Sequence, residues 1–352
     1  MKRFIRVALS NEAELYKLVK LMLLLLKKNA FSLSLLAIVW FAIVFPQVAS
    51  GSELLNSKWL SKSSVAIIFF LQGWSLPTRS LAAGYKPLRL HGFVLFWNFV
   101  CFPAVAMLML CPVAWFLPSE LLLGFGVLAF LPTTIASATA YTAISEGNVA
   151  NAIVSTVLSN LLAVFVVPAV AVVYFRLELS IDIPFSKVLL SLMYTLVAPL
   201  TLGQIFQRLF RGNANTMAKM ARWTSAFLIL FIVYLAFAGS MNAGIFERLS
   251  FGSLIVTLLT VVLLLLVTSV LVWKSVFWLD LKMSQRIAAF YCGSQKSLAS
   301  GLPLVSSILL SIPSLKDTAI IFIPLLCFHP LQMLLAGIVS PLLKSERNTM
   351  EA

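Results

Sequence analysis

The chain has 352 residues, of which 61% are hydrophobic and only 11% are charged, and its formal net charge is +14. Soluble domains usually contain about 25% charged residues, so no soluble fold could cover this much apolar surface and the solvent must be lipid. In a soluble protein the positive charge would suggest nucleic acid. Here lysine and arginine lie between apolar runs, as topology signals do, so the lipid bilayer rather than nucleic acid is the predicted partner.

Residues 1–28 are basic and precede the first apolar run. They are predicted to form a cytoplasmic segment, either an amphipathic helix at the membrane surface or a solvated tail. Ten apolar runs follow, each read as a membrane-spanning helix. They cover residues 29–52, 63–78, 90–119, 121–145, 147–175, 188–207, 223–246, 249–273, 287–315 and 318–343. The first run ends like a signal-peptide cleavage site, but the long polar segment before it favours a span.

Ten spans place both termini on the same side of the membrane. With the termini cytoplasmic, the outer loops hold few basic residues, namely Lys58, Lys62, Arg176, Lys187, Arg248 and Lys316. The positive-inside rule therefore favours ten spans in an inner or plasma membrane. Residues 29–175 and 188–344 each contain five spans, joined by an outer linker, 176–187, and followed by a cytoplasmic tail, 345–352. Two five-span units must insert in opposite orientations, which is the plan of inverted-repeat transporters.

The predicted spans lack acidic residues at their centres, although the chain has 12 acids. A sodium or proton site based on a buried carboxylate is therefore hard to assemble. The two histidines, His91 and His329, cannot form a His-rich metal site, and the four cysteines have no metal-ligand spacing. We predict no metal site and no cofactor, and no nucleophile–base pair indicates an enzyme.

The fourth run contains a proline followed by hydroxyl residues. Pro132 removes a backbone donor and weakens the helix before it. One interpretation is a kink whose freed backbone groups bond to nearby hydroxyls. The other is a broken helix whose new N-terminus faces a cavity. The candidate site residues here are Thr133, Thr134, Ser137 and Thr139.

The ninth run has a polar cluster near its middle, flanked by Gly293 and by Gly301 with Pro303. The candidate site residues are Ser294, Gln295, Lys296 and Ser297. A charge at the bilayer centre costs about 3 kcal/mol on insertion scales. One interpretation of Lys296 is structural: its side chain snorkels to the membrane surface or fills a gap in the packing. The other is that Lys296 belongs to a substrate or ion site. Because no span offers a carboxylate, its charge must meet carbonyls, hydroxyls, water or an anionic ligand.

Three other spans carry polar residues. Asn98 lies in the third, Thr156 and Ser159 in the fifth, and His329 with Gln332 in the tenth. Each residue is read either as an interhelical hydrogen bond or as part of a substrate or ion site.

These motifs together resemble the bile acid:sodium symporter family, in the branch of the sodium/bile acid cotransporter 7 and its bacterial homologues. The resemblance extends from about Ala66 to Ser345. It rests on Ile67–Phe70 with Gly73–Leu76, Pro132–Thr134 through Glu146–Asn148, Lys296–Leu298 with Gly301–Pro303, and Ile323–Pro330. It implies an all-α membrane protein of ten helices in two inverted repeats, with a core domain and a panel domain. It also implies that helices 4 and 9 are broken and cross at mid-membrane.

Sodium-coupled members of the family hold sodium on helices 4, 5 and 9, and here the pattern departs from theirs. Thr156 matches, but a hydroxyl position falls on Ala152. Gly293 and Gln295 match a Glu-x-Gly-x-Gln motif, whereas Tyr291 occupies the glutamate position. Lys296 follows directly and adds a positive charge beside the expected cation sites. These departures weaken the case for sodium coupling.

The predicted function is secondary active transport of a small organic anion that binds where the broken helices cross. Lys296 is predicted to replace sodium, so that transport is proton-coupled or uncoupled. Two alternatives stay open. One is a genuine sodium symporter that uses neutral ligands, and the other is a non-transporting membrane regulator of ion homeostasis.

Overall fold

The computed structural model describes residues 30–50, 58–75, 84–179, 190–209, 214–242, 249–310 and 318–351. All regular structure in these residues is helical, which confirms the predicted all-α class. The predicted N-terminal segment, 1–28, lies outside them, as does most of the linker 176–187. The helices are α2 Ala30–Val44, α3 Gln47–Ser50, α4 Lys58–Ser75, α6 Leu88–Phe96, η1 Trp97–Cys101, α7 Phe102–Leu110, η2 Ala114–Phe116, α8 Ser119–Phe130, α9 Ile135–Ile144, α10 Val149–Leu179, η3 Met193–Val197, α12 Ala198–Leu209, α13 Ala214–Asn242, α14 Phe251–Val276, α15 Met283–Ser294, α16 Leu298–Leu310 and α17 Thr318–Glu351.

Six helices in the described residues are long and apolar enough to cross a membrane. They are Leu88–Leu110, Val149–Val170, Leu190–Leu209, Lys219–Asn242, Phe251–Val276 and Ala319–Met350. The helices α8 and α9, bent by 56°, make a seventh if they form one span. The number ten therefore stays a prediction. The remaining predicted spans are short or interrupted: α2 has 15 residues, and α15 and α16 are separated by Gln295–Ser297.

Large apolar side chains are exposed on the outer helix faces, among them Leu36, Leu108 and Leu263. Monomeric soluble proteins rarely expose extended apolar patches. Three strongly exposed tryptophans, Trp59, Trp115 and Trp278, lie at or just beyond helix ends. Tryptophan is enriched at the boundary between membrane and water. Both features fit a multi-pass membrane protein.

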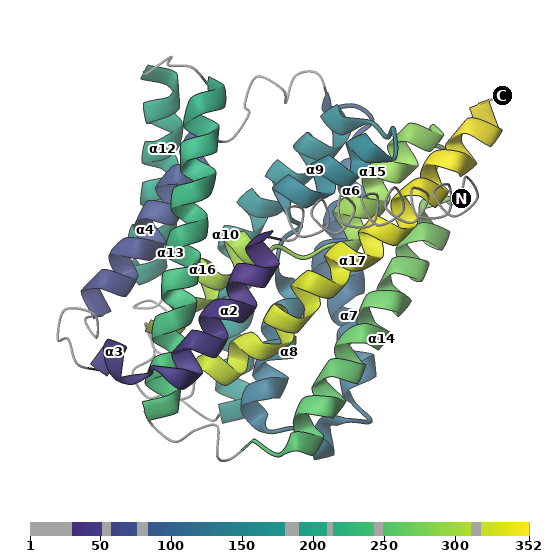
Figure 1. The fold of residues 1–352 in the computed structure, drawn as a ribbon. Helices are drawn as coiled ribbons and strands as arrows, with labels where there is room; N and C mark the ends of the chain where they lie inside the picture. Colours follow the sequence, from purple (N-terminus) through teal and green to yellow (C-terminus); the bar gives the residue numbers. More distant parts are fainter. Residues whose placement is uncertain are drawn as a thin grey trace, which may run out of the picture.

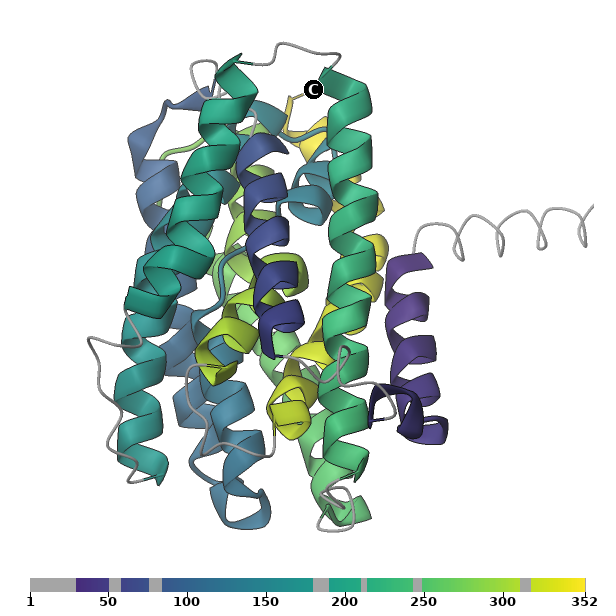
Figure 2. The same ribbon diagram turned by 90° about the vertical axis from the view of Figure 1, so that its left-hand side faces the viewer.

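The helices fall into two groups by their contacts. In the smaller group, α12, α4, α13 and α2 stand side by side in that order (Figure 2). The larger group contains α6 to α10, α14, α15 and α17, most of which lie to the right in Figure 1. Helix α16 contacts α4 and α13 of the smaller group as well as α10 and α17 of the larger one. The second half of the ninth predicted span therefore lies between the two groups.

Helices α4 and α12 approach each other at two glycines. A Cβ atom on Gly73 would overlap the carbonyl oxygen of Leu200, and one on Gly203 would overlap that of Phe70. Gln204 also donates a hydrogen bond from Nε2 to the carbonyl of Gly73. Small residues allow membrane helices to pack closely in this way, and the contact makes α4 and α12 one rigid pair.

Helix α9 ends in a turn that is usually built on glycine. The amide of Gly147 donates to Thr142 O at 2.7 Å and that of Glu146 to Ala143 O at 3.0 Å, which is the Schellman pattern. Its left-handed position is occupied by Glu146, with φ of 57°. A side chain in this conformation costs about 1–2 kcal/mol, so other contacts must hold the residue there.

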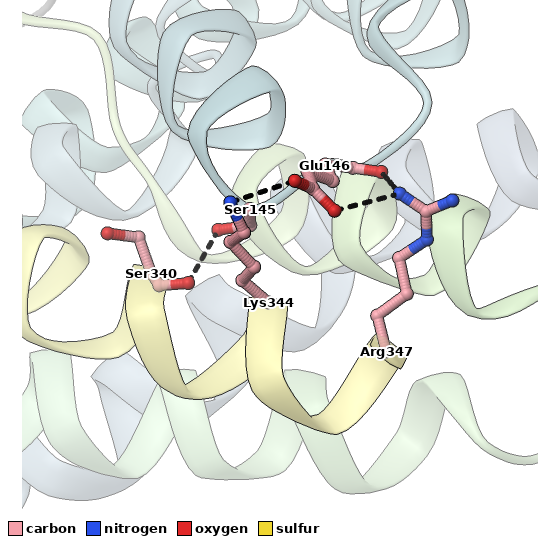
Figure 3. Close-up of polar contacts among 5 residues, drawn as sticks. All are labelled: Ser145, Glu146, Ser340, Lys344 and Arg347. Atoms are coloured by element: carbon pink, nitrogen blue, oxygen red, sulfur yellow. Dashed lines mark hydrogen bonds and ion pairs between the residues drawn. The ribbon is translucent and has the colours of Figure 1, made fainter. Parts of the chain in front are cut away.

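Ion pairs with the end of α17 supply those contacts (Figure 3). Lys344 Nζ lies 2.8 Å from the Glu146 carboxylate, and Arg347 Nη1 lies 3.6 Å from it. Arg347 also donates to the Glu146 carbonyl. Beside them, Ser145 donates from Oγ to Ser340 O at 3.2 Å. The predicted tail 345–352 thus begins as a helical continuation of α17 that holds the end of α9.

Candidate functional site

The first break separates α8 from α9 at Leu131–Thr134. Proline disfavours the helical conformation of the residue before it, and Leu131 has φ of −63° and ψ of 149°. Thr134 is also extended, with ψ of 134°, and a new helix begins at Ile135. Four residues outside helical geometry therefore interrupt the fourth run, which excludes a simple kink and fits the broken-helix interpretation.

The second break separates α15 from α16 at Gln295–Ser297, where Gln295 has φ of −97° and ψ of 147°. Proline does not cause this break, because Pro303 lies inside α16. Ser297 begins the new helix by accepting a hydrogen bond at Oγ from the amide of Ser300 at 3.1 Å. The polar cluster predicted from the sequence is therefore the break itself.

The two breaks touch each other. The amide of Ser297 donates to the carbonyl of Pro132 at 2.7 Å. Ser137 donates from Oγ to Gln295 Oε1 at 2.9 Å. These bonds join residues more than 150 positions apart, so the fourth and ninth predicted spans meet at their interruptions.

Lys296 is fully buried, with no exposed surface. Its ammonium donates to three backbone carbonyls: Asn98 O at 3.0 Å, Ala129 O at 2.8 Å and Leu131 O at 2.9 Å. Nζ also lies 4.1 Å from the centre of the Phe102 ring, as in a cation–π contact. None of the ion pairs in the described part of the chain involves Lys296. The three carbonyls and the ring are called the carbonyl cage below.

The local backbone explains why these carbonyls are free. In the π-helical turn η1, the amide of Phe102 donates to Trp97 O. The next such bond would join Asn98 O to residue 103, which is a proline without an N–H. Ala129 O loses its helical partner because the amide of Thr133 donates instead to Ser159 Oγ, at 3.2 Å. The carbonyl cage therefore arises from Pro103 and the break after α8.

The electrostatics of the cage favour a cation. Helix α8 ends at Phe130, so its last carbonyls carry the negative end of the helix dipole. The ammonium replaces its hydration shell with three carbonyl dipoles and one aromatic face. This arrangement offsets the cost of burying a charge without a carboxylate.

Other predicted site residues lie beside the cage. Asn98 donates from Nδ2 to Cys292 O at 3.1 Å and to Ser159 Oγ at 3.4 Å. His329 Nδ1 lies 3.0 Å from Gln332 Nε2, and its ring meets that of Phe31 edge-on. Three polar atoms at the crossing are buried and have no partner in the described residues: Asn98 Oδ1, Thr133 Oγ1 and Gln295 Nε2.

The side chains of several predicted site residues do not reach the point where the two breaks meet. The hydroxyls of Thr139, Thr156 and Ser294 bond to carbonyls of their own helices, Ile135 O, Ile153 O and Phe290 O. Thr134 is buried and precedes α9, but its side chain makes no capping bond. The structure thus brings together Asn98, Thr133, Ser137, Gln295, Lys296, Ser297 and His329.

Two further amide residues lie at the crossing: Asn160, which the sequence did not single out, and Gln332, which was named beside His329. Asn160 donates to Thr133 O at 2.9 Å and accepts from Ser300 Oγ at 2.6 Å. Gln332 pairs with the backbone of Lys296. Asn160 is an amide side chain within an apolar run, which is a signal that could have singled it out.

A cleft lies beside the breaks, between the two helix groups. It is narrow, with room for little more than a water molecule. Pro132 and Ile135 at the start of α9, and Ser300 in the first turn of α16, form one wall with Asn160. Gln72 of α4 lies opposite and donates to Ala299 O at 3.2 Å. The rest of the lining is apolar.

Apolar helices around two broken helices that meet at a buried cation define a multi-pass membrane protein with a polar centre. The sequence model of the SBF-like CPA transporter family (DUF4137) matches residues 29–345. The chain therefore belongs to this transporter family, and the resemblance seen in its motifs is confirmed.

Named relatives align over nearly the whole chain. The sodium/bile acid cotransporter 7 of Danio rerio is 28% identical over 327 residues, covering 91% of this chain and 94% of the relative. The protein of the same name from Mus musculus is 27% identical, covering 91% and 93%. The uncharacterized protein PA2026 of Pseudomonas aeruginosa is 27% identical, covering 88% and 91%.

Proposed function

We propose that the protein is a secondary active transporter of a small organic anion in which the Lys296 ammonium replaces sodium. The observation that carries this proposal is the carbonyl cage. Three carbonyls within 3.0 Å of Nζ form the kind of oxygen environment that a bound alkali cation would need. The ammonium of a lysine in that position is covalently tethered and occupies the place of a free cation. Uptake therefore does not require sodium.

The anionic substrate is supported by the two helices that begin at the breaks. Helices α9 and α16 start at Ile135 and Leu298, and their first turns border the cleft. Helix N-termini carry partial positive charge and exposed N–H groups, which favour anions. The relatives named sodium/bile acid cotransporter 7 also point to an organic solute.

The proposed architecture has two inverted five-helix repeats, 29–175 and 188–344, with a core domain and a panel domain. Its support is the occurrence of one break in the fourth predicted span and one in the ninth. Both termini are proposed to be cytoplasmic. In support, predicted inner segments lie together: Arg89 Nη2 is 3.3 Å from Asp280, and the amide of Asn148 donates to Ser284 O at 2.7 Å.

The test begins with a thermal-shift screen of purified protein against organic carboxylates and sulfates, in sodium or choline chloride and at two pH values. A stabilising anion is then used for uptake into proteoliposomes. Uptake by the natural protein should be equal in sodium and choline. Uptake that follows the pH gradient indicates proton coupling through Lys296, and uptake indifferent to it indicates uncoupled transport.

Lys296→Ala gives the matched comparison because it empties the carbonyl cage and keeps every cage carbonyl. The variant should lose sodium-independent uptake and any dependence on the pH gradient. Restoration of uptake by sodium would show that the cage accepts a free cation. Natural protein that transports only in sodium would contradict the proposal.

Sodium symport with neutral ligands is the second candidate. The buried oxygens Asn98 Oδ1 and Thr133 Oγ1, which lack partners in the described residues, favour it. Loss of uptake in choline would establish this function. A screen in which no anion stabilises the protein and no flux is measured would instead favour the non-transporting regulator.

A further inference from the structure

The two helix breaks are held in the same manner. At the first, the amide of Thr133 donates to Ser159 Oγ at 3.2 Å, and its carbonyl accepts from Asn160 Nδ2 at 2.9 Å. At the second, the amide of Lys296 donates to Gln332 Oε1 at 2.8 Å, and its carbonyl accepts from Gln332 Nε2 at 2.8 Å. In both cases the holding side chains come from the long helix that follows the break, α10 or α17.

These bonds answer a need that the break creates. A buried backbone amide or carbonyl without a partner costs about as much as a lost hydrogen bond. Thr133 and Lys296 lie outside helical geometry and are buried, so their peptide groups need partners from elsewhere. The primary amide of Gln332 serves as donor and acceptor for one residue, as a neighbouring β-strand would.

The Lys296 backbone fixes the orientation of that amide, and His329 accepts its second hydrogen. Gln332 Nε2 carries two hydrogens, and its partners are Lys296 O and His329 Nδ1, at 2.8 and 3.0 Å. Nδ1 accepts, so the imidazole proton lies on Nε2. A flipped Gln332 amide would set its oxygen against Lys296 O and its nitrogen against the Lys296 amide. Oε1 therefore faces the Lys296 N–H.

We infer that Gln332 is a positioning residue that keeps the Lys296 ammonium in the carbonyl cage, with His329 supporting it. The inference rests on the proposed function, in which Lys296 replaces the coupling cation. The side chain of Lys296 spans from the second break to the end of α8, so its reach depends on where its own backbone is held. Gln332 holds both polar groups of that backbone.

The experiment measures the reactivity of Lys296 directly. Purified protein in detergent is treated with an amine-acetylating reagent, and modification at Lys296 is quantified by mass spectrometry. The buried ammonium of the natural protein should react slowly. Gln332→Ala should raise the rate about tenfold or more, because local opening becomes easier when two bonds to a buried peptide are lost.

Two variants separate positioning from general damage. Ser340→Ala changes a residue of the same helix whose hydroxyl donates to Gly337 O, and it should leave the Lys296 rate unchanged. The carboxylate of Gln332→Glu can accept from the Lys296 amide but cannot donate to its carbonyl, so the rate should be intermediate at the alkaline pH used for acetylation. If Gln332→Ala does not fold, the Lys296 acetylation rates of Gln332→Glu and His329→Ala test the inference instead, and both should be raised. His329→Gln should keep the natural rate because its side chain retains an acceptor for the Gln332 amide.

An unchanged Lys296 rate in folded Gln332→Ala would overturn the inference, whatever transport shows. Hydrogen exchange adds a second readout: peptides covering 295–298 should exchange faster in Gln332→Ala, while those covering 131–134 should not. A raised rate at Lys296 with natural uptake would support the positioning role and contradict the proposed function. The two failures are therefore distinguishable.

Discussion

At the scale of single residues, Lys296 poses a problem of energy balance. An ammonium at the bilayer centre costs about 3 kcal/mol on insertion scales. Three buried carbonyls without donors would cost about 1–3 kcal/mol each. Because the described residues offer the cage carbonyls no other hydrogen-bond donor, the second cost exceeds the first, and the lysine is favoured where it lies.

Lys296→Met should therefore destabilise the protein, although it removes a buried charge. Methionine has a similar length and is apolar, so it fills the space but leaves Asn98 O, Ala129 O and Leu131 O unpaired. We expect a net loss of up to a few kcal/mol, measured as a lower Tm in detergent. Lys274→Met, at a lysine near the end of α14, is the control. An equal or higher Tm for Lys296→Met would contradict this balance.

Glu146 gives a prediction about pH. The hydrogen bond and charge of Lys344, together with the charge of Arg347, lower the pKa of the Glu146 carboxyl below its usual value of 4.5. A carboxyl with a lowered pKa contributes stability above its unfolded pKa and loses it as pH falls through the folded one. The contribution should therefore be constant at neutral pH and fade only below about pH 4.5.

Glu146→Gln measures this contribution. The variant should have a lower Tm than the natural protein by the same amount at pH 6 and pH 8, and the gap should close as the pH falls below 4.5. High salt should also narrow the gap, because the carboxylate is solvent-exposed and its ion pairs are screened. A gap that changes between pH 6 and pH 8 would mean that another group titrates in this contact.

At the scale of helices, close packing of α4 on α12 depends on the absence of side chains. In Gly203→Ala, the new Cβ would overlap the carbonyl oxygen of Phe70, and backbone cannot move aside easily. Overpacking of this kind costs about 1–3 kcal/mol, so the Tm should fall by several degrees.

Gly239→Ala is the matched control on α13. No atom lies within 4 Å of its added Cβ, and the residue is helical. Alanine favours a helix over glycine by about 1 kcal/mol, so its Tm should stay level or rise. A similar loss of stability in both variants would show that the α4–α12 contact is not the cause.

The two helix breaks differ in how far sequence could foresee them. The first follows from Pro132, whose ring and missing N–H act on its own neighbours. The polar cluster marks the place of the second, but its backbone is held by Gln332, which lies 36 residues away. The sequence showed that no predicted span offers Lys296 a carboxylate partner. It could not show which carbonyls it meets, because Asn98 O is freed by a π-helical turn.

At the scale of the whole molecule, charge patterning predicted a membrane protein. It also assigned to one side of the membrane the inner segments that lie together at one end of the structure. The number of spans is harder to predict from charge patterning, since spans that carry a break or flanking lysines fall short of a continuous apolar helix. Those same spans, α15 with α16 and α4, supply Lys296 and Gln72. Polar residues that build a site make a span harder to recognise.

The contact between Gln72 and Ala299 offers a test of motion between the two helix groups. It joins α4 of the smaller group to α16, across the cleft. If transport moves the larger group together with α16 against the smaller one, this contact must break in each cycle. Cysteines at both positions, in a chain lacking the natural cysteines, can be joined by a short bifunctional thiol reagent that is cleaved by reduction.

Cross-linking should stop uptake, and reduction should restore it, while each single-cysteine variant treated with the same reagent keeps its activity. The matched pair is Cys at positions 70 and 206, where the Phe70 and Phe206 rings lie 5.8 Å apart within the α4–α12 unit. Because both helices belong to the smaller group, that link should leave uptake unchanged. Full transport by the protein cross-linked between positions 72 and 299 would mean that the solute crosses without relative movement of α4 and α16.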